Sequence, residues 1–318
     1  MNKNLYRIVF NQARGLMMAV AEIASARGKG TSSANSLGVT RGSAIQVRFA
    51  KLKLLPLATQ LACGASLLLL PIAQAQIIPD AAAPGNQRPT VISAPNGVPL
   101  VNIQTPSAAG VSRNTYSQFD VQKQGAILNN ANTITNTQLG GFVAGNPNLV
   151  GGTARVILNE VNSSNPSLLR GYIEVGGNSA QVIVANPSGI TCDGCGFINA
   201  NRATLTTGTP ILNGGSLDGY LVQRGAITIQ GAGLDASQSG FTDIIARAVQ
   251  VNAGIFAQEL KITAGANQVS ADHGQITPVA GIGDAPAFAI DVAQLGGMYA
   301  NKILLIGTEA GVGVRNAG

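Results

Sequence analysis

The sequence has no tryptophan, and only 4% of its 318 residues are aromatic and 11% charged. Such low charge does not suit a helical globule with polar outer faces, and a hydrophobic content of 45% excludes a disordered chain. Glycine is abundant, with 40 residues. The composition therefore favours many short strands and tight turns, in which small side chains stack.

Basic charge is also missing from most of the chain, despite a net charge of +6. Residues 1–53 contain nine lysines and arginines and one acid, Glu22, which leaves eleven bases and thirteen acids in the remainder. A nucleic-acid-binding domain needs a basic patch. We therefore expect no nucleic-acid partner.

The apolar run at 54–72 follows Arg48, Lys51 and Lys53 and precedes a small-x-small site that ends at Ala75. This order predicts a secretory signal cleaved between Ala75 and Gln76. A transmembrane helix is the alternative, because about 20 apolar residues span a bilayer. Several residues within the run weaken that alternative: Pro56, Gln60, Gly64 and Pro71.

An unusually long segment precedes this signal. Residues 5–24 predict a basic amphipathic helix, with Leu5, Ile8, Val9, Leu16, Val20 and Ile23 near one face. An organellar transit peptide is the alternative, but the site at Ala75 behind a full apolar run disfavours it.

Short β-branched runs at 156–158, 172–175, 181–184 and 203–207 are separated by clusters of Asn, Pro, Gly and Ser, the pattern of strands joined by turns. Further strand centres are expected near Val182, Thr204, Ile227, Ile245, Ile262, Ala289 and Leu304. Up to Ala289 they are 17 to 27 residues apart, close to the ~20-residue lower limit of solenoid repeats. This favours a parallel β-helix, and an antiparallel sandwich is the alternative.

Two Asn-Pro turns frame the segment 146–190. Their residues are Asn146, Pro147, Asn148 and Leu149 in the first, and Asn186, Pro187, Ser188, Gly189 and Ile190 in the second. With these motifs the chain resembles the amino-terminal secretion domain of two-partner-secretion exoproteins, which include filamentous haemagglutinin and the contact-dependent inhibition toxins. The family usually has Asn where this chain has Ser188. The first 29 residues, MNKNLYRIVFNQARGLMMAVAEIASARGK, resemble the extended signal peptide region of large Gram-negative exoproteins.

The resemblance implies an all-β, right-handed parallel β-helix over 76–318, with an amino-terminal cap at 76–110 that sequence alone would take for a linker. Residues 1–75 would be the extended signal peptide, with its extended region at 1–30 and its n-, h- and c-regions at 48–75. Tyr116, Phe119 and Val121 are expected to pack inward. Because 302–318 ends without a polar cap, we expect a truncated exoprotein or a fragment.

The implied function is that of a secretion domain. The signal would engage the inner-membrane Sec machinery, and an outer-membrane β-barrel transporter with periplasmic domains would then recognise the domain. The exoprotein would fold at the surface of a Gram-negative cell, with host or neighbouring cells as further partners. The Asn-Pro motifs either support the fold that the transporter recognises, which we favour, or contact it directly. A surface adhesin or haem-binding protein is the alternative, and a β-helix polysaccharide lyase or hydrolase is a third possibility.

Cys192 and Cys195 form the one constellation with a chemical spacing. A thiol redox motif requires a helix amino terminus, and zinc requires four ligands. A structural disulfide is the better interpretation in an exported protein, and a free or exchange-active pair is the alternative. Cys63 would be removed with the signal.

No catalytic, metal or cofactor site is predicted. His273, the only histidine, is expected to be an exposed loop residue, and no nucleophile can be paired with it. Asp235 and Asp243 are the nearest pair of acids for a polysaccharide-cleaving site. We therefore expect a protein that is not an enzyme.

Overall fold

The computed structural model describes residues 6–11, 16–21 and 76–318. The chain divides into two compact units, Met1–Leu70 and Pro71–Gly318, which are described separately. No helix long and apolar enough to cross a membrane occurs among the described residues. The predicted apolar signal run and Ala75 lie outside them.

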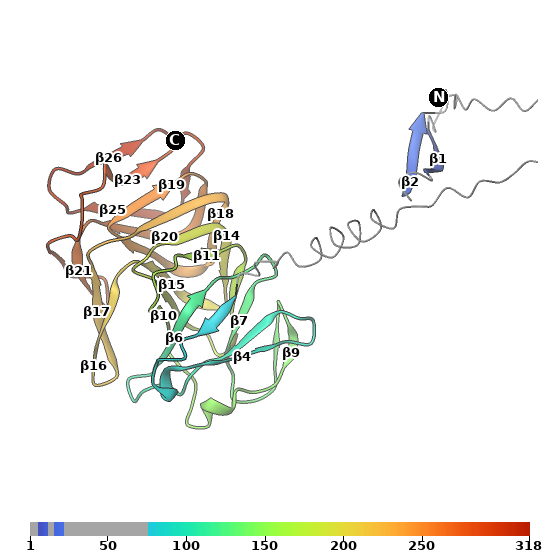
Figure 1. Cartoon of the computed structure of the whole chain (residues 1–318), viewed down its shortest axis with the longest axis horizontal. Helices are drawn as coiled ribbons and strands as arrows, with labels where there is room; N and C mark the ends of the chain where they lie inside the picture. Colours follow the sequence, from blue (N-terminus) through green and yellow to red (C-terminus); the bar gives the residue numbers. More distant parts are fainter. Residues whose placement is uncertain (1–5, 12–15, 22–75) are drawn as a thin grey trace, which may run out of the picture. The chain divides into compact units, whose positions relative to one another are not determined.

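In the first unit, β1 (Tyr6–Asn11) and β2 (Leu16–Ala21) pair antiparallel, with Tyr6 opposite Ala21 (Figure 1). The helix predicted over 5–24 is therefore wrong for these residues. Ile8, Val9 and Phe10 are β-branched or aromatic, which favours a strand. Gly15, which would lie inside the predicted helix, disfavours one.

The second unit is a solenoid with three parallel ladders. One ladder stacks β6 (Val111–Phe119), β10 (Val156–Val161), β13 (Ala180–Ala185), β15 (Ala200–Thr206), the end of β18 (Ala226–Ala246), the end of β20 (Gly254–Ala264) and β25 (Lys302–Gly307). The second stacks β11 (Ser167–Leu169), β14 (Ile190–Ile198), the start of β18, β19 (Ala248–Val251), β23 (Phe288–Val292) and β26 (Gly313–Asn316). The third stacks β5 (Pro99–Asn102), β7 (Ala126–Asn130), β12 (Tyr172–Gly177), the end of β14, the middle of β18, the start of β20 and β24 (Gly297–Tyr299).

Because successive strands visit the three ladders in turn, each circuit adds one coil, which is the predicted parallel β-helix. The antiparallel sandwich is therefore wrong. Side chains at matching positions stack inside the coils: Val184, Leu205, Ile244 and Ile262 follow one another in register and are all buried. Such columns explain how short apolar runs separated by turns form one continuous core.

Residues 76–110 form a cap on the first coils, as the resemblance implied, and are not a linker. Its elements are β3 (Ile77–Pro79), η2 (Gly85–Gln87), β4 (Thr90–Ser93) and β5. β3 pairs antiparallel with β6, and β4 with β5. Tyr116, Phe119 and Val121 are buried, which confirms that prediction, and the rings of Tyr116 and Phe119 meet edge-on at 4.9 Å.

Two antiparallel additions lie outside the coils. A four-stranded sheet contains β16 (Thr209–Asn213), β17 (Ser216–Val222), β21 (Asn267–Ser270) and β22 (Ile276–Pro278). It packs on the solenoid through a second apolar cluster that includes Leu158, Ile183, Tyr220 and Val269. The other addition is a hairpin of β8 (Thr135–Thr137) and β9 (Gly141–Val143).

Candidate functional site

The first Asn-Pro turn is built around the buried side chain of Asn146. Its Nδ2 donates to the carbonyl oxygens of Ile103 and Asn129, each at 2.9 Å, and its Oδ1 accepts from the Asn148 backbone N–H at 3.0 Å. It thereby caps the short helix η3 (Pro147–Leu149), with Pro147 at its first position. The sequence predicts this turn, because Asn is a preferred N-cap residue and Pro is favoured at the first position of a helix.

The rest of this turn is anchored in the same way. Leu149 is fully buried in the main core, and Asn148 Nδ2 donates to the carbonyl of Ile103 at 3.1 Å. Only Pro147 and the following Val150 are exposed.

The second turn repeats the design at the next ladder. Buried Asn186 donates through Nδ2 to the Asn165 carbonyl at 2.9 Å and to Ser167 Oγ at 3.0 Å, and its Oδ1 accepts from the Ser188 N–H at 2.9 Å. Ser188, which replaces the family's usual Asn, donates through Oγ to the Ser163 carbonyl at 3.0 Å. Gly189 has a φ of 114°, a conformation that favours glycine, and the next residue, Ile190, is buried.

In both turns the amide groups of the first Asn are therefore used inside the domain. In the folded state, neither the side-chain amide of Asn146 nor that of Asn186 is exposed to a partner. In the folded domain, this geometry supports a structural role for both motifs.

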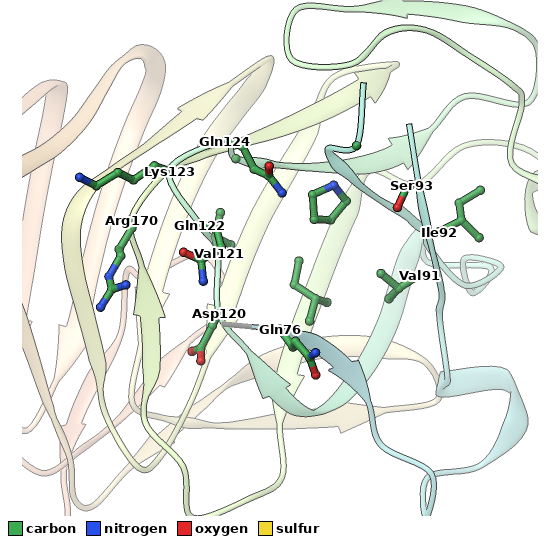
Figure 2. Close-up of a pocket in the computed structure, with 14 residues that line it drawn as sticks. Gln76, Val91, Ile92, Ser93, Asp120, Val121, Gln122, Lys123, Gln124 and Arg170 are labelled. Atoms are coloured by element: carbon green, nitrogen blue, oxygen red, sulfur yellow. The ribbon is translucent and has the colours of Figure 1, made fainter. Parts of the chain in front are cut away.

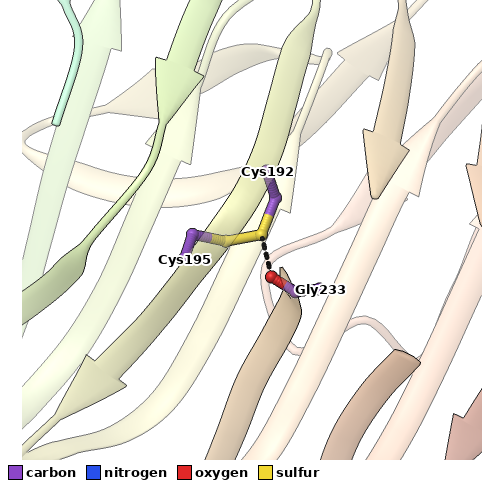
Figure 3. Close-up of a disulfide and its surroundings, with 3 residues drawn as sticks. All are labelled: Cys192, Cys195 and Gly233. Carbon is purple, nitrogen blue, oxygen red and sulfur yellow. Dashed lines mark hydrogen bonds between the residues drawn. A yellow bond between two sulfur atoms is a disulfide. The ribbon is translucent and has the colours of Figure 1, made fainter. Parts of the chain in front are cut away.

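Cys192 and Cys195 are joined by a disulfide within β14, and both are buried (Figure 3). Sγ of Cys192 lies 3.2 Å from the carbonyl oxygen of Gly233 on the next coil. Gly194 between the cysteines has a φ of 84°, and the register of β14 with β18 shifts there. The disulfide closes this bulge, in the part of the ladder that follows the second Asn-Pro turn.

The prediction that His273 is exposed is wrong: its side chain is only 1% exposed. It lies at the turn between β21 and β22, with a φ of 61°, and its Nδ1 is 2.9 Å from Asp243 Oδ1 and 2.9 Å from Arg202 Nη2. Lys261 Nζ also donates to the His273 carbonyl at 2.5 Å. The sequence places these residues far apart, and the solenoid brings β15, β18 and β20 to one face beneath the added sheet.

This polar cluster holds the added sheet against the coils. Burial raises the pKa of Asp243, but the hydrogen bonds from His273 and Arg202 outweigh burial and hold that pKa below its usual range. His273 Nε2 and the Tyr220 hydroxyl are both buried without a hydrogen-bond partner. The cluster therefore joins two parts of the fold.

Asp235 and Asp243 are held by different sets of hydrogen-bond partners. Asp235 accepts from the Tyr172 hydroxyl at 2.7 Å and from Ser237 Oγ at 2.6 Å, whereas Asp243 accepts from Arg202 and His273. Each carboxylate therefore has its own partners within a different ladder. Among the described residues, no group of three His, Cys, Asp or Glu side chains is placed to bind a metal ion.

A cavity of about 780 Å³ opens at the cap. Figure 2 shows Lys123 and Arg170 on one side of it and Val91 and Ile92 on the other. Asp120 also lines it, but its carboxylate accepts from the Leu168 N–H at 2.7 Å and from a neighbouring glutamine side chain. The cavity therefore offers no pair of free acids of the kind that glycoside hydrolysis requires.

Residues 75–318 match a family described as the TPS secretion domain, and residues 1–50 match the Extended Signal Peptide of Type V secretion system. The crystal structure of the filamentous hemagglutinin secretion domain is similar, with a TM-score of 0.69 and 36% identity over 76% of this chain and 81% of that chain.

Two curated relatives align with the whole chain. Toxin CdiA of Yersinia pestis is 58% identical over 319 residues, and tRNA nuclease CdiA-2 of Burkholderia pseudomallei is 49% identical over 322 residues. In each case the alignment covers 100% of this chain and 10% of the relative. The chain thus spans about a tenth of the length of these relatives.

Proposed function

We propose that residues 76–318 are recognised in the periplasm by the periplasmic domains of a dedicated outer-membrane transporter, because the chain belongs to the family of TPS secretion domains. Domains of this family serve large exported exoproteins of the CdiA and filamentous hemagglutinin type. Exoproteins of this kind, which carry an extended signal peptide, reach the surface of Gram-negative cells through the periplasm. The domain then folds outside the cell.

The observation that carries the proposal is the capped three-ladder solenoid. In the cap, β3 pairs antiparallel with β6 and β5 pairs in parallel with β7, and the coils that follow pair in parallel with one another. Each coil can therefore form on a completed one as the chain emerges, and a folded coil is too wide to return through a pore. Folding from the cap onward makes export directional without a nucleotide site.

We propose no catalytic role for residues 76–318. The names of the relatives report a toxin and a tRNA nuclease, but this chain spans about a tenth of their length. Contact with host or neighbouring cells would then depend on the exported protein as a whole.

The test is secretion of the full 318-residue chain in cells that also express a candidate outer-membrane transporter of this secretion system. We expect the chain in the medium or on the cell surface, and retention in the periplasm when the transporter is omitted. Co-purification of the chain with the transporter's periplasmic region is the second measurement. Equal release with and without the transporter, or cell-surface binding by 76–318 with no binding to the transporter, would contradict the proposal and favour an adhesin.

A further inference from the structure

The cap leaves one of the three ladders uncovered at its start. In the cap, β3 pairs with β6 of the first ladder, and β5 pairs with β7 of the third. In the second ladder, the first pairing is the isolated bridge between Val121 and Leu169, and no cap strand of the described residues pairs with Val121. The cavity of about 780 Å³ lies at this gap, because Val121 and residues of β3 and β4 line it.

The cap side of the cavity is largely apolar. Ile77, Val91, Ile92 and Pro99 line it there, and the buried side chain of Val121 lines it from the coils. Uncharged polar residues complete the lining, among them Ser93 and three glutamines, Gln76, Gln122 and Gln124. An apolar surface with a few hydrogen-bonding groups, in a cavity of this volume, is typical of a small-molecule site.

Two cations lie on the other side of the cavity, Lys123 and Arg170, and both are exposed (Figure 2). Eight of the eleven lysines and arginines in 76–318 bond to a carboxylate or a carbonyl oxygen. Within the described part of the chain, only Lys123, Arg170 and Arg224 have no such partner for the side chain. Two of these three therefore line the same cavity.

One carboxylate also lines the cavity, that of Asp120, but it is already engaged by the fold. The residue is only 7% exposed, and its two oxygens accept from the Leu168 N–H at 2.7 Å and from the Gln118 side chain at 2.6 Å. Two exposed cations thus outnumber one buried acid. Such a charge distribution attracts an anion.

These features together describe the ligand. It must have an aliphatic surface for the cap side, groups that hydrogen-bond to amides and hydroxyls, and a negative charge for the two cations. A sugar acid meets all three requirements, because its ring carries C–H groups, hydroxyl groups and an anionic substituent. The guanidinium of arginine binds carboxylate or phosphate through two parallel hydrogen bonds.

From these observations we propose that the cap cavity is a binding site for a sugar that carries a carboxylate or a phosphate. The anion lies between Lys123 and Arg170, and the ring packs against Val91 and Ile92. The inference goes beyond the proposed function. The site exists only in the folded domain, so it acts after export and does not involve the transporter.

The test uses the purified mature domain, since Pro71–Gly318 form a compact unit of their own. Three probes share one ring and differ in charge: glucose, glucuronic acid and glucose 6-phosphate. In a titration followed by NMR, we expect a dissociation constant on the order of 1 mM for at least one of the acids, and at least tenfold weaker binding of glucose. The amide signals of residues 121–125 and 170 should shift. The acid that binds more tightly identifies carboxylate or phosphate as the preferred anion.

The variants Lys123→Ala and Arg170→Ala should each weaken binding of that acid about tenfold, as when a hydrogen bond to a charged group is lost. Arg224→Ala is the matched control, because Arg224 is also exposed and without a partner but lies between β17 and β18, outside the cavity lining. It should leave binding unchanged. All three variants should melt at the wild-type temperature, since their side chains are exposed.

Three results would overturn the inference: no binding of either acid, equal affinity for glucose and the acids, or equal weakening by Arg224→Ala and Arg170→Ala. Each would leave the proposed function intact, because binding is measured without the transporter. Conversely, release of the chain without a transporter would overturn the proposed function and leave the sugar site standing.

Discussion

Replacing Asn146 by alanine separates the two roles that its motif could have. The change removes three buried hydrogen bonds, two donated to the Ile103 and Asn129 carbonyls and one accepted from the Asn148 N–H. The Ile103 carbonyl keeps a donor, because Asn148 Nδ2 also bonds to it. The Asn129 carbonyl and the Asn148 N–H each lose this side-chain partner, at about 1–3 kcal/mol each, so that we expect a loss of about 2–6 kcal/mol in the free energy of unfolding.

Asn148→Ala is the matched control. This change removes one side-chain hydrogen bond, to the Ile103 carbonyl, which still accepts a bond from Asn146. The Asn148 side chain is half-buried. We expect it to cost less than about 1 kcal/mol. The chain has no tryptophan whose fluorescence could report unfolding, so the urea unfolding of 76–318 is followed by circular dichroism.

The same two variants are then measured for secretion of the full chain. If the motif is structural, secretion falls in step with stability, and Asn146→Ala is the more severe change. The reasoning fails if Asn146→Ala unfolds within about 0.5 kcal/mol of wild type, the range of a neutral surface change, while secretion collapses. That result would assign the amide to direct contact with the transporter.

Three further outcomes are expected. Thiol titration of the unfolded, unreduced mature domain should find no free thiol, and two free thiols would show that the disulfide is absent. The double change Cys192→Ala and Cys195→Ala should lower the free energy of unfolding by about 2 kcal/mol, as the short closed loop predicts. Folding lowers the pKa of Asp243, so its ionised form stabilises the fold above the unfolded pKa of about 3.9, and this stabilisation is lost as the pH falls below that value. The difference in melting temperature between wild type and Asp243→Asn should therefore shrink between pH 5 and about 3. A difference that stays constant would contradict the assignment. Gly196→Ala should lower the melting temperature, because a Cβ there would lie 2.4 Å from a tyrosine ring and 2.7 Å from a carbonyl oxygen, whereas Gly151→Ala, with nothing within 4 Å, should not.

The parts of the fold that the sequence predicted correctly are those set by local patterns. The β-branched runs near Val182, Thr204 and Ile262 became strands, because each carries its own strand preference and is bounded by turn residues. The Asn-Pro turns were also visible, because side chain and backbone interact within three residues. Repetition of these short elements then favoured a solenoid.

The features that sequence reasoning missed depend on contacts between distant residues. His273 lies 71 residues from Arg202, and its burial depends on an added sheet whose strands come from two separate insertions. A lone histidine in a Gly-containing loop gives no local sign of this. The prediction for the amino-terminal segment failed for another reason: Ile8 and Val9 fit the apolar face of a helix by periodicity, although β-branched residues prefer a strand.

This contrast between local and distant contacts also sets an order for folding at the cell surface. A coil needs only the coil before it, and the first Asn-Pro turn uses residues no further away than Ile103, so the cap and first coils can form early. The cluster of Arg202, Asp243 and His273 needs β15, β18 and the β21–β22 turn together, so it can close only after at least three more strands have emerged. The added sheet therefore completes the fold only after the cap and the first coils have formed.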